Sequence, residues 1–281
     1  MNKIVRKSVL NEQVVLMEIE APRVAKKAEP GQFIIFRIDE YGERIPLTIA
    51  DFDREKGTVT IIFQIVGKST MQLSELNEGD SILDFVGPLG TASHLEGYKK
   101  VAVIGGGLGT AIAYPQAKKL KQLGAEVHMI TGFRSKDIII LEEECRRISD
   151  KLIVTTDDGS NGTKGLVTDI LKGLIEDGNE YDLVIAIGPL VMMKFVSMLT
   201  KTYGIKTIVS MNPVMIDGTG MCGGCRITVG GKTKFACVDG PDFDGHEVDF
   251  DSAMKRQQMY KSFERKASET HKCRMEGMAD A

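Results

Sequence analysis

Hydrophobic and polar residues follow two different rhythms along this chain of 281 residues. Up to about residue 97, short runs rich in β-branched and aromatic residues are separated by turns such as Pro30-Gly31 and Gly79-Asp80. Many short strands with turns of this kind predict a β-barrel or a sandwich. We expect strands at 14–19, 32–38, 58–66 and 81–86, with a single helical stretch at 69–76.

From Lys99 the rhythm changes to an alternation of apolar strands and helical segments, which predicts an α/β fold with a doubly wound parallel sheet. The expected strands are 101–104, 127–131, 152–154, 183–187 and 207–210, and the expected helices lie near 109–123, 138–148, 165–174 and 190–203. The predicted divisions are a barrel at 1–97, the α/β domain at 98–210, a small cysteine-containing appendage at 211–250, and a charged helix with a tail at 251–281.

Composition narrows the class of protein without deciding its chemistry. With 42% hydrophobic residues, 27% charged residues and a formal net charge of −3, the chain is typical of soluble globular proteins and gives no reason to expect nucleic acid as a partner. We expect no membrane span and no signal peptide, because no apolar run approaches roughly 20 residues. Five cysteines, three of them clustered, favour the cytoplasm over a disulfide framework, and Cys145 and Cys273 stand apart as expected non-ligands.

The clustered cysteines suggest a metal centre. Cys222 and Cys225 flank two glycines, Cys237 follows, and Asp217 stands where a fourth cysteine would be expected. Thiolates at this spacing bind iron–sulfur clusters or zinc, and a glycine-rich turn lets backbone amides approach the sulfurs. Three thiolates and one carboxylate would satisfy a [2Fe–2S] centre. A zinc site with the same ligands is chemically possible, and three core cysteines brought together by chance are the plainer alternative.

A glycine-rich turn directly follows the first apolar strand of the α/β region. Its residues are Gly105, Gly106, Gly107 and Gly109, with Thr110 in the place of the third fingerprint glycine. Such a turn lets a pyrophosphate approach the backbone at a helix N-terminus, and its place at the start of a βαβ series favours dinucleotide binding over a merely tight turn. Gly188-Pro189 would lie at the same edge of the sheet, where it is either part of this site or an ordinary turn.

A second group of candidate binding residues lies in the predicted barrel. It comprises Arg44, Pro46, Leu47 and Thr48 on one segment, and Gly67, Ser69 and Thr70 at the start of the expected helix. An arginine is a natural partner for pyrophosphate, and a helix N-terminus offers further donors. Taken alone, Arg44 would be a solvated strand residue and Ser69 or Thr70 an ordinary N-cap. Together, in a barrel that precedes a nucleotide domain, they suggest a second cofactor.

The order of these motifs resembles the ferredoxin reductase-like flavoproteins. Within them the chain resembles the electron-transfer subunits of class B dihydroorotate dehydrogenase and, more closely, the small subunits of the NADH-dependent reduced ferredoxin:NADP oxidoreductases. The resemblance covers about residues 1–250 and is most specific at 211–225 and 237–250. The dihydroorotate subunits have a cysteine as first ligand, whereas Asp217 occupies that place here, as in the second family. Pro46 stands where the wider family has a tyrosine that packs on the flavin.

The resemblance implies three cofactors: FAD, NAD(H) and a [2Fe–2S] cluster. It assigns FAD to Arg44, Pro46, Leu47, Thr48, Gly67, Ser69 and Thr70; the nicotinamide nucleotide to Gly105, Gly106, Gly107, Gly109, Thr110, Gly188 and Pro189; and the cluster to Asp217, Cys222, Cys225 and Cys237. No catalytic side chain beyond the cofactors is implied. Arg134 and Lys136 could bind a 2′-phosphate, but the resemblance favours NAD(H) over NADP(H).

The resemblance also implies that the chain is an oxidoreductase subunit in a heterodimer. A larger subunit with a flavin and [4Fe–4S] clusters would bifurcate electrons and react with ferredoxin and NADP(H). Two alternatives stay open. The chain could instead be the electron-transfer subunit of an NAD-dependent dihydroorotate dehydrogenase, or a zinc-stabilised nucleotide-binding module without redox activity.

Overall fold

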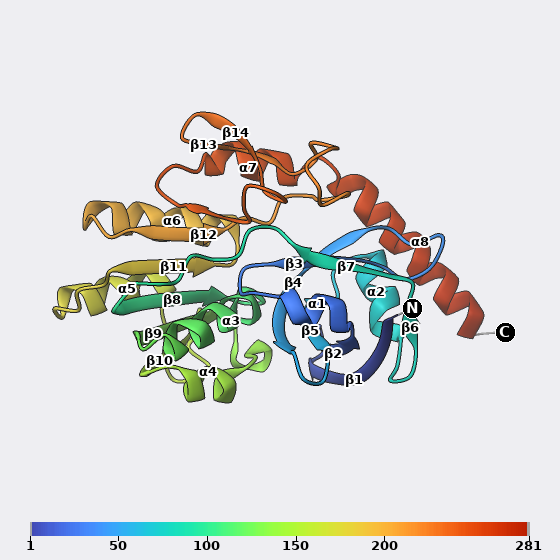
Figure 1. Cartoon of the computed structure of the whole chain (residues 1–281), viewed down its shortest axis with the longest axis horizontal. Coiled ribbons are helices and arrows are strands. Elements are labelled where there is room, and N and C mark those ends of the chain that lie inside the picture. The colour runs from blue at the N-terminus through green and yellow to red at the C-terminus, as the bar shows by residue number, and fades with distance from the viewer. Residues whose placement is uncertain (1, 280–281) are drawn as a thin grey trace.

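Two β-sheets lie side by side in the computed structural model, and the C-terminal segments lie across both (Figure 1). The structure describes the backbone of residues 2–279 and the side chains of residues 2–271. The strands of the barrel come from the N-terminal third of the chain, and the α/β sheet comes mainly from the middle.

The barrel is a nearly closed seven-stranded antiparallel sheet with the order β6-β1-β2-β5-β4-β3-β7. Its strands are β1 (Asn2–Asn11), β2 (Val14–Glu20), β3 (Phe33–Arg37), β4 (Ile45–Asp53), β5 (Thr58–Gln64), β6 (Ser81–Ile82) and β7 (Asp84–Leu89). Phe36, Phe63 and Met17 are fully buried inside it. The helix α2 (Lys68–Glu75) confirms the predicted helical stretch.

The prediction of a single helix in this region was wrong, because α1 (Pro22–Lys27) also forms. Six residues are too few to show a helical period, but Pro22 at the first helical position is a start signal that could have been used. The prediction also missed β1 and β4. The strand β1 carries exposed charged residues at the sheet edge, and β4 contains Pro46, so neither has the continuous apolar pattern of a buried strand.

The second sheet has six strands in the order β10-β9-β8-β11-β12-β15. Its elements are β8 (Lys100–Gly106), α3 (Gly109–Gln122), β9 (Glu126–Phe133), a 3₁₀ turn η1 (Lys136–Ile138), α4 (Glu142–Ile148), β10 (Lys151–Thr156), α5 (Val167–Glu176), β11 (Leu183–Ile187), α6 (Leu190–Thr202), β12 (Thr207–Ser210) and β15 (Asp242–Asp244). The first five strands are parallel, as predicted, and β15 adds an antiparallel edge that the sequence pattern did not indicate.

Helices cover both faces of this sheet, which explains its uninterrupted apolar strands. Val101 and Val103 pack toward α3, while Ala102 and Ile104 pack toward α5 and α6. The two sheets join through a smaller apolar cluster that includes Ala50 of β4 and Phe133 of β9.

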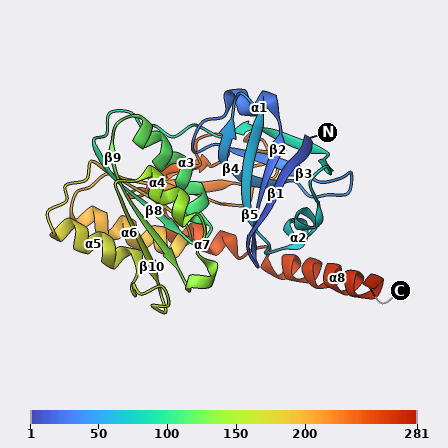
Figure 2. The same ribbon diagram turned by 90° about the horizontal axis from the view of Figure 1, so that it is seen from below.

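The C-terminal part consists of a hairpin and two helices. The hairpin is β13 (Arg226–Val229) with β14 (Lys232–Phe235), followed by α7 (Phe250–Gln257) and α8 (Lys261–Ala279). Figure 2 shows α8 running along the barrel beside α2, where His271 lies 3.5 Å from Glu75. Cys273 lies outside the residues whose side chains are described. None of the described helices combines the length and the hydrophobicity that crossing a membrane requires.

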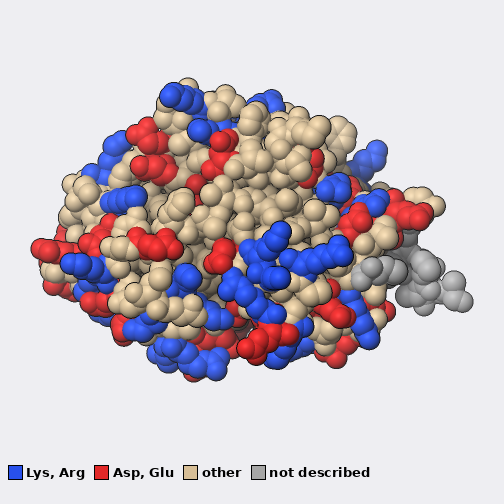
Figure 3. All heavy atoms as spheres, in the orientation of Figure 1, with Lys and Arg blue, Asp and Glu red and all other residues tan. Residues whose placement is uncertain are grey.

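The surface carries charges of both signs. In Figure 3, Lys and Arg side chains alternate with Asp and Glu side chains over much of the face that is shown, and a broad uncharged stretch lies across its upper part. This mixture agrees with the small net charge of −3.

Candidate functional site

A cavity of about 1290 Å³ lies where the barrel, the α/β sheet and the C-terminal segment meet. Seven of the predicted cofactor-binding residues line it: Pro46, Thr48, Gly106, Gly107, Gly109, Gly188 and Pro189. The C-terminal segment contributes Met211, Asn212 and Met215 to the same walls. Ligand pockets of single small molecules are typically about 300–1,000 Å³, so this cavity has room for more than one such group.

The glycine-rich turn forms one wall of the cavity, and its positions favour glycine either because space is short or because φ is positive. A Cβ at Gly109 would lie 2.2 Å from the carbonyl oxygen of Ile187, so α3 can start directly against β11 only with glycine there. A Cβ at Gly188 would lie 3.1 Å from Gly106, so the ends of β8 and β11 also approach closely. Gly107 has a φ of +55°, which favours glycine, and no neighbouring atom lies within 4 Å of the point that a Cβ would occupy. The turn therefore presents bare backbone to the cavity, which fits a pyrophosphate.

Two other residues of this motif serve packing. Gly105 lies against the backbone of Thr110, where a Cβ would come within 2.6 Å of the threonine Cα. Thr110 is fully buried, and its Oγ1 has no hydrogen-bond partner among the described residues. Its predicted contact with a nucleotide stays a prediction.

Several predicted FAD residues lie outside the lining of the cavity. Arg44 donates from Nε to the carbonyl oxygen of Ile216 at 3.0 Å, which leaves the two Nη groups of its guanidinium for another partner. Ser69 donates to Glu43 at 2.7 Å. The Thr70 hydroxyl accepts from the amide of Gly67 at 3.1 Å and so caps α2. Leu47 packs against the barrel core.

The predicted cluster ligands are only partly gathered. The sulfurs of Cys225 and Cys237 lie 3.2 Å apart and both residues are buried. Cys222 is exposed and its Sγ accepts from the Gly224 amide at 3.4 Å. Within residues 2–271, no group of three or more His, Cys, Asp or Glu side chains is arranged around one point as metal ligands. Cys145 is buried in α4, apart from this segment, and its expected absence from the ligand set stays a prediction.

The ionisation of these groups follows their surroundings. Partial burial acts to raise the pKa of the Asp217 carboxyl, but hydrogen bonds from the amides of Thr219 and Cys222 outweigh it and lower the pKa to about 2. Burial, reinforced by the neighbouring Cys225 thiol, raises the pKa of Cys237 to about 12. Metal binding would deprotonate such thiols, since thiolates are the ligands. An ionised carboxylate and three unpaired thiols on one glycine-rich segment are a donor set that fits an iron–sulfur cluster.

Sequence reasoning missed two groups of polar residues at this junction. Arg226 and Arg256 donate to backbone carbonyls of the Cys222–Cys225 turn. Asp242 is half-buried as a residue with its Oδ1 fully buried, and its Oδ2 accepts hydrogen bonds from Ser93 at 2.6 Å and from Gln116 at 3.1 Å. Arg256 and Asp242 lie 32 to 149 residues from their hydrogen-bond partners in the sequence, so no local motif marks them. Arg226 is the exception, because it lies close to its partner.

Comparison with known proteins places this geometry among redox proteins. Residues 212–249 match the iron–sulfur cluster binding domain of dihydroorotate dehydrogenase B. A dihydroorotate dehydrogenase B (NAD(+)) electron transfer subunit homolog of Thermotoga maritima is 48% identical over 265 residues, which cover 94% of this chain and 93% of the relative.

Solved structures of redox proteins also match this chain. A chain in the structure of an NADH-dependent reduced ferredoxin-NADP oxidoreductase, determined for insight into flavin-based electron bifurcation, has a TM-score of 0.91 and 47% identity, covering 96% of this chain and 97% of that one. A ferredoxin reductase of carbazole 1,9a-dioxygenase has a TM-score of 0.63 at 19% identity over 73% of this chain and 65% of that one, a likeness that shows the fold alone. The predicted ferredoxin reductase-like fold is thus confirmed.

Proposed function

This chain belongs to the family of dihydroorotate dehydrogenase B electron transfer subunits and their homologs, and from this membership we propose that it carries electrons between NAD(H), FAD and a [2Fe–2S] cluster. Within the family, we assign it to the electron-bifurcating NADH-dependent ferredoxin:NADP oxidoreductases. One observation carries the proposal: the barrel, the glycine-rich turn and residues 211–215, which lead into the cysteine turn, meet at one cavity. When bound, FAD supplies the exchange between the two electrons of a hydride and the single electrons that a cluster accepts.

The residues of the chain position these groups. We assign the nicotinamide nucleotide to the turn from Gly105 to Gly109, of which Gly106, Gly107 and Gly109 present backbone to the cavity, with Gly188 and Pro189 at the facing strand end. Pro46 and Thr48 on β4 would hold the flavin in the same cavity. Arg44 has free Nη groups for the flavin pyrophosphate. Apolar side chains such as Met211 and Phe33 line the cavity and would exclude water from the reacting groups.

Asp217, Cys222, Cys225 and Cys237 are the proposed cluster ligands. Cys225 and Cys237 already lie together, and Asp217 is ionised and close in sequence to the turn. Asp217→Cys should keep the cluster and lower its reduction potential, because a thiolate donates more electron density than a carboxylate. An unchanged potential and an unchanged spectrum would remove Asp217 from the ligand set.

The electrons must leave the chain through a partner. We propose a larger subunit that bears a flavin and [4Fe–4S] clusters, reacts with ferredoxin and NADP(H), and forms a heterodimer with this chain. The two homologous systems named above both combine a small electron-transfer chain with other components. The ferredoxin-NADP oxidoreductase chain is 47% identical, whereas an electron transfer subunit of dihydroorotate dehydrogenase B itself is 33% identical, and this difference favours the first system. Unpaired cysteines suit a reducing compartment, and we place the complex in the cytoplasm.

Two measurements test the proposal. A visible spectrum of the purified chain should show bound flavin and a [2Fe–2S] cluster, whereas a zinc-stabilised module would be colourless. Co-purification from the native cell followed by identification of the companion chain decides the system: a dihydroorotate dehydrogenase as companion would favour the alternative assignment, and a protein with [4Fe–4S] motifs would support ours.

A further inference from the structure

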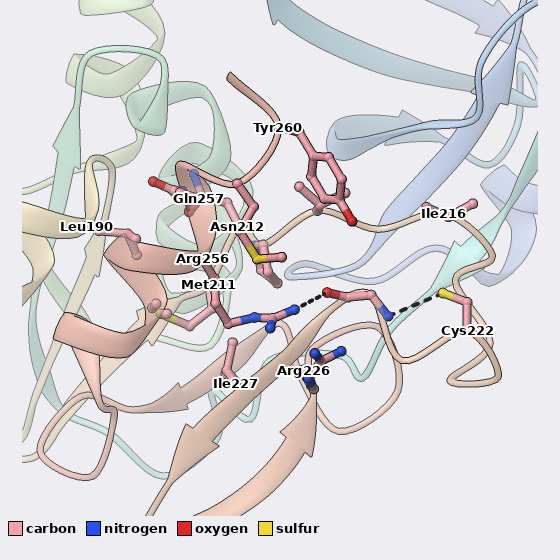
Figure 4. Close-up of a pocket in the computed structure, with 15 residues that line it drawn as sticks. Leu190, Met211, Asn212, Ile216, Cys222, Arg226, Ile227, Arg256, Gln257 and Tyr260 are labelled. Atoms are coloured by element: carbon pink, nitrogen blue, oxygen red, sulfur yellow. Dashed lines mark hydrogen bonds between the residues drawn. The ribbon is translucent and has the colours of Figure 1, made fainter. Parts of the chain in front are cut away.

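Two arginines hold the backbone of the Cys222-Gly223-Gly224-Cys225 turn. Arg226, the first residue of β13, donates from Nη1 to the carbonyl oxygen of Gly223 at 3.0 Å. Arg256, on α7, donates from Nη2 to the carbonyl oxygen of Gly224 at 3.2 Å. Figure 4 shows Arg256 reaching this backbone from the helix side, with Cys222 on the opposite side of the turn.

The carbonyl that Arg226 binds belongs to the same peptide unit as an amide that faces a sulfur, and Arg256 binds the next carbonyl along the turn. The amide of Gly224 donates to Cys222 Sγ at 3.4 Å, and the carbonyl of that peptide unit is the oxygen that Arg226 binds. A cation on the carbonyl oxygen polarises the peptide, which makes its N–H a stronger donor. Stronger hydrogen bonds to sulfur and nearby positive charge both stabilise the reduced, more negative form of an iron–sulfur cluster, so they raise its reduction potential.

Among residues 2–271, neither Arg226 nor Arg256 forms a salt bridge with a carboxylate, and two acidic residues of these segments have other partners. Asp251 pairs with Lys194 at 2.7 Å, and Asp239 lies 3.5 Å from Lys234. Arg256 is partly buried and lines the small cavity of about 200 Å³ that also contains Cys222 and Gly224. Its charge is therefore less screened by solvent than that of an exposed side chain.

The helix that carries Arg256 lies beyond the cluster-binding match, which ends at residue 249. The Asp249 carboxylate caps α7 by accepting from the Ser252 amide at 3.0 Å. Phe250 and Ala253 are buried and anchor the helix on the body of the protein. The position of Arg256 is thus fixed by an element that follows the cysteine segment rather than by the cysteine motif itself.

We propose that Arg256, with Arg226 as its partner, is a positioning residue for the cluster site. Its hydrogen bond fixes the Gly224-Cys225 peptide, next to the peptide that Arg226 binds, and its charge raises the reduction potential of the cluster. The proposal rests on the function proposed above, since it requires that a [2Fe–2S] cluster binds at this turn. It makes α7 a part of the redox centre, with a role beyond covering the hydrophobic core.

The test compares Arg256→Met with Lys255→Met in the full chain. Lys255 is exposed and adjacent on the same helix, so its replacement removes the same charge without touching the turn. Arg256→Met should lower the midpoint potential in a titration monitored by electron paramagnetic resonance. It should also speed the loss of iron to a chelator roughly fivefold, the effect of one lost hydrogen bond. Lys255→Met should match the wild type in both, and Arg256→Lys should keep most of the potential because it keeps the charge.

The outcomes distinguish a failure of the proposed function from a failure of the role assigned to Arg256. If the wild-type chain binds no [2Fe–2S] cluster, both the proposed function and this inference are overturned. If it binds the cluster but Arg256→Met and Lys255→Met give the same potential and the same rate of iron loss, only the role of Arg256 is overturned. A lower potential in Arg256→Met with unchanged flavin content supports the role and rules out general misfolding as its cause.

Discussion

Replacing Gly109 with alanine should destabilise the protein through one steric contact. The new Cβ would lie 2.2 Å from the carbonyl oxygen of Ile187 and 2.8 Å from the Cα of Gly188. Both are backbone atoms, so no side-chain rotation can relieve the clash. Ordinary van der Waals contact begins at 3.4 Å, so α3 and the end of β11 must separate by about 1.2 Å, the difference between these distances.

The cost of this separation follows from what α3 buries. Ala113, Ala117 and Leu120 are fully buried against the sheet, so the helix cannot move away without loosening that core. Overpacking a core costs about 1–3 kcal/mol, and a clash with backbone belongs at the upper end. The higher helix propensity of alanine offsets up to about 1 kcal/mol of this loss in the free energy of unfolding. A net loss of about 2 kcal/mol should lower the Tm by roughly 4–8 °C.

Gly173→Ala is the matched control, because it makes the same chemical change in another helix. Gly173 lies within α5, and a Cβ there would meet no atom within 4 Å. It should raise the Tm by roughly 2–4 °C from propensity alone. Thermal unfolding followed by far-UV circular dichroism, at equal flavin content, measures both. If Gly109→Ala were as stable as the wild type, the close packing of α3 against β11 would be refuted.

Three further predictions concern single residues. Arg44→Ala should release FAD while the fold persists, because a charge-assisted contact to phosphate is worth about 1.5–3 kcal/mol; flavin retention after gel filtration measures this, and Arg54→Ala, which removes an arginine that pairs with Glu29, should retain flavin. Burial raises the pKa of the Asp242 carboxyl, so the folded protein binds this proton more tightly than the unfolded chain does. The contribution of Asp242 to stability therefore falls as the pH rises above about 4. Asp242→Asn should flatten the pH dependence of the Tm, and an unaltered profile would contradict this. Turnover with an artificial acceptor should be much faster with NADH than with NADPH, and a preference for NADPH that disappears in Arg134→Ala would reverse the assignment.

The sequence predicted those parts of the fold in which local pattern and burial agree. The strands of the α/β sheet are buried on both faces, so their apolar runs are visible without knowledge of the neighbours. The strand β1 lies toward the edge of the barrel and carries the exposed charged residues Lys3 and Arg6, and β15 has only three residues, so neither gives such a signal. Both form because partner strands supply their hydrogen bonds.

In the candidate site, too, the sequence predicted features that are local and missed those that depend on distant partners. The glycine-rich turn is recognisable because backbone geometry demands glycine at consecutive positions. Arg256 and Asp242 could not be found in this way, because their partners lie 32 to 149 residues away in sequence and meet them only in the folded chain. The motif predicted which atoms could bind a cluster, whereas the groups that position them come from separate elements.

The antiparallel strand β15 has a consequence for how the chain can be made and divided. It pairs with β12 and places Phe243 in the hydrophobic core, although it follows the cysteine segment in the sequence. During synthesis the α/β sheet therefore stays incomplete until residues 242–244 have left the ribosome. A chain shortened after β12 would leave that strand as an open edge with unpaired backbone groups, which invites pairing between molecules. The segment that carries the cysteines thus also covers the β12 edge, and we expect an α/β domain made without it to aggregate.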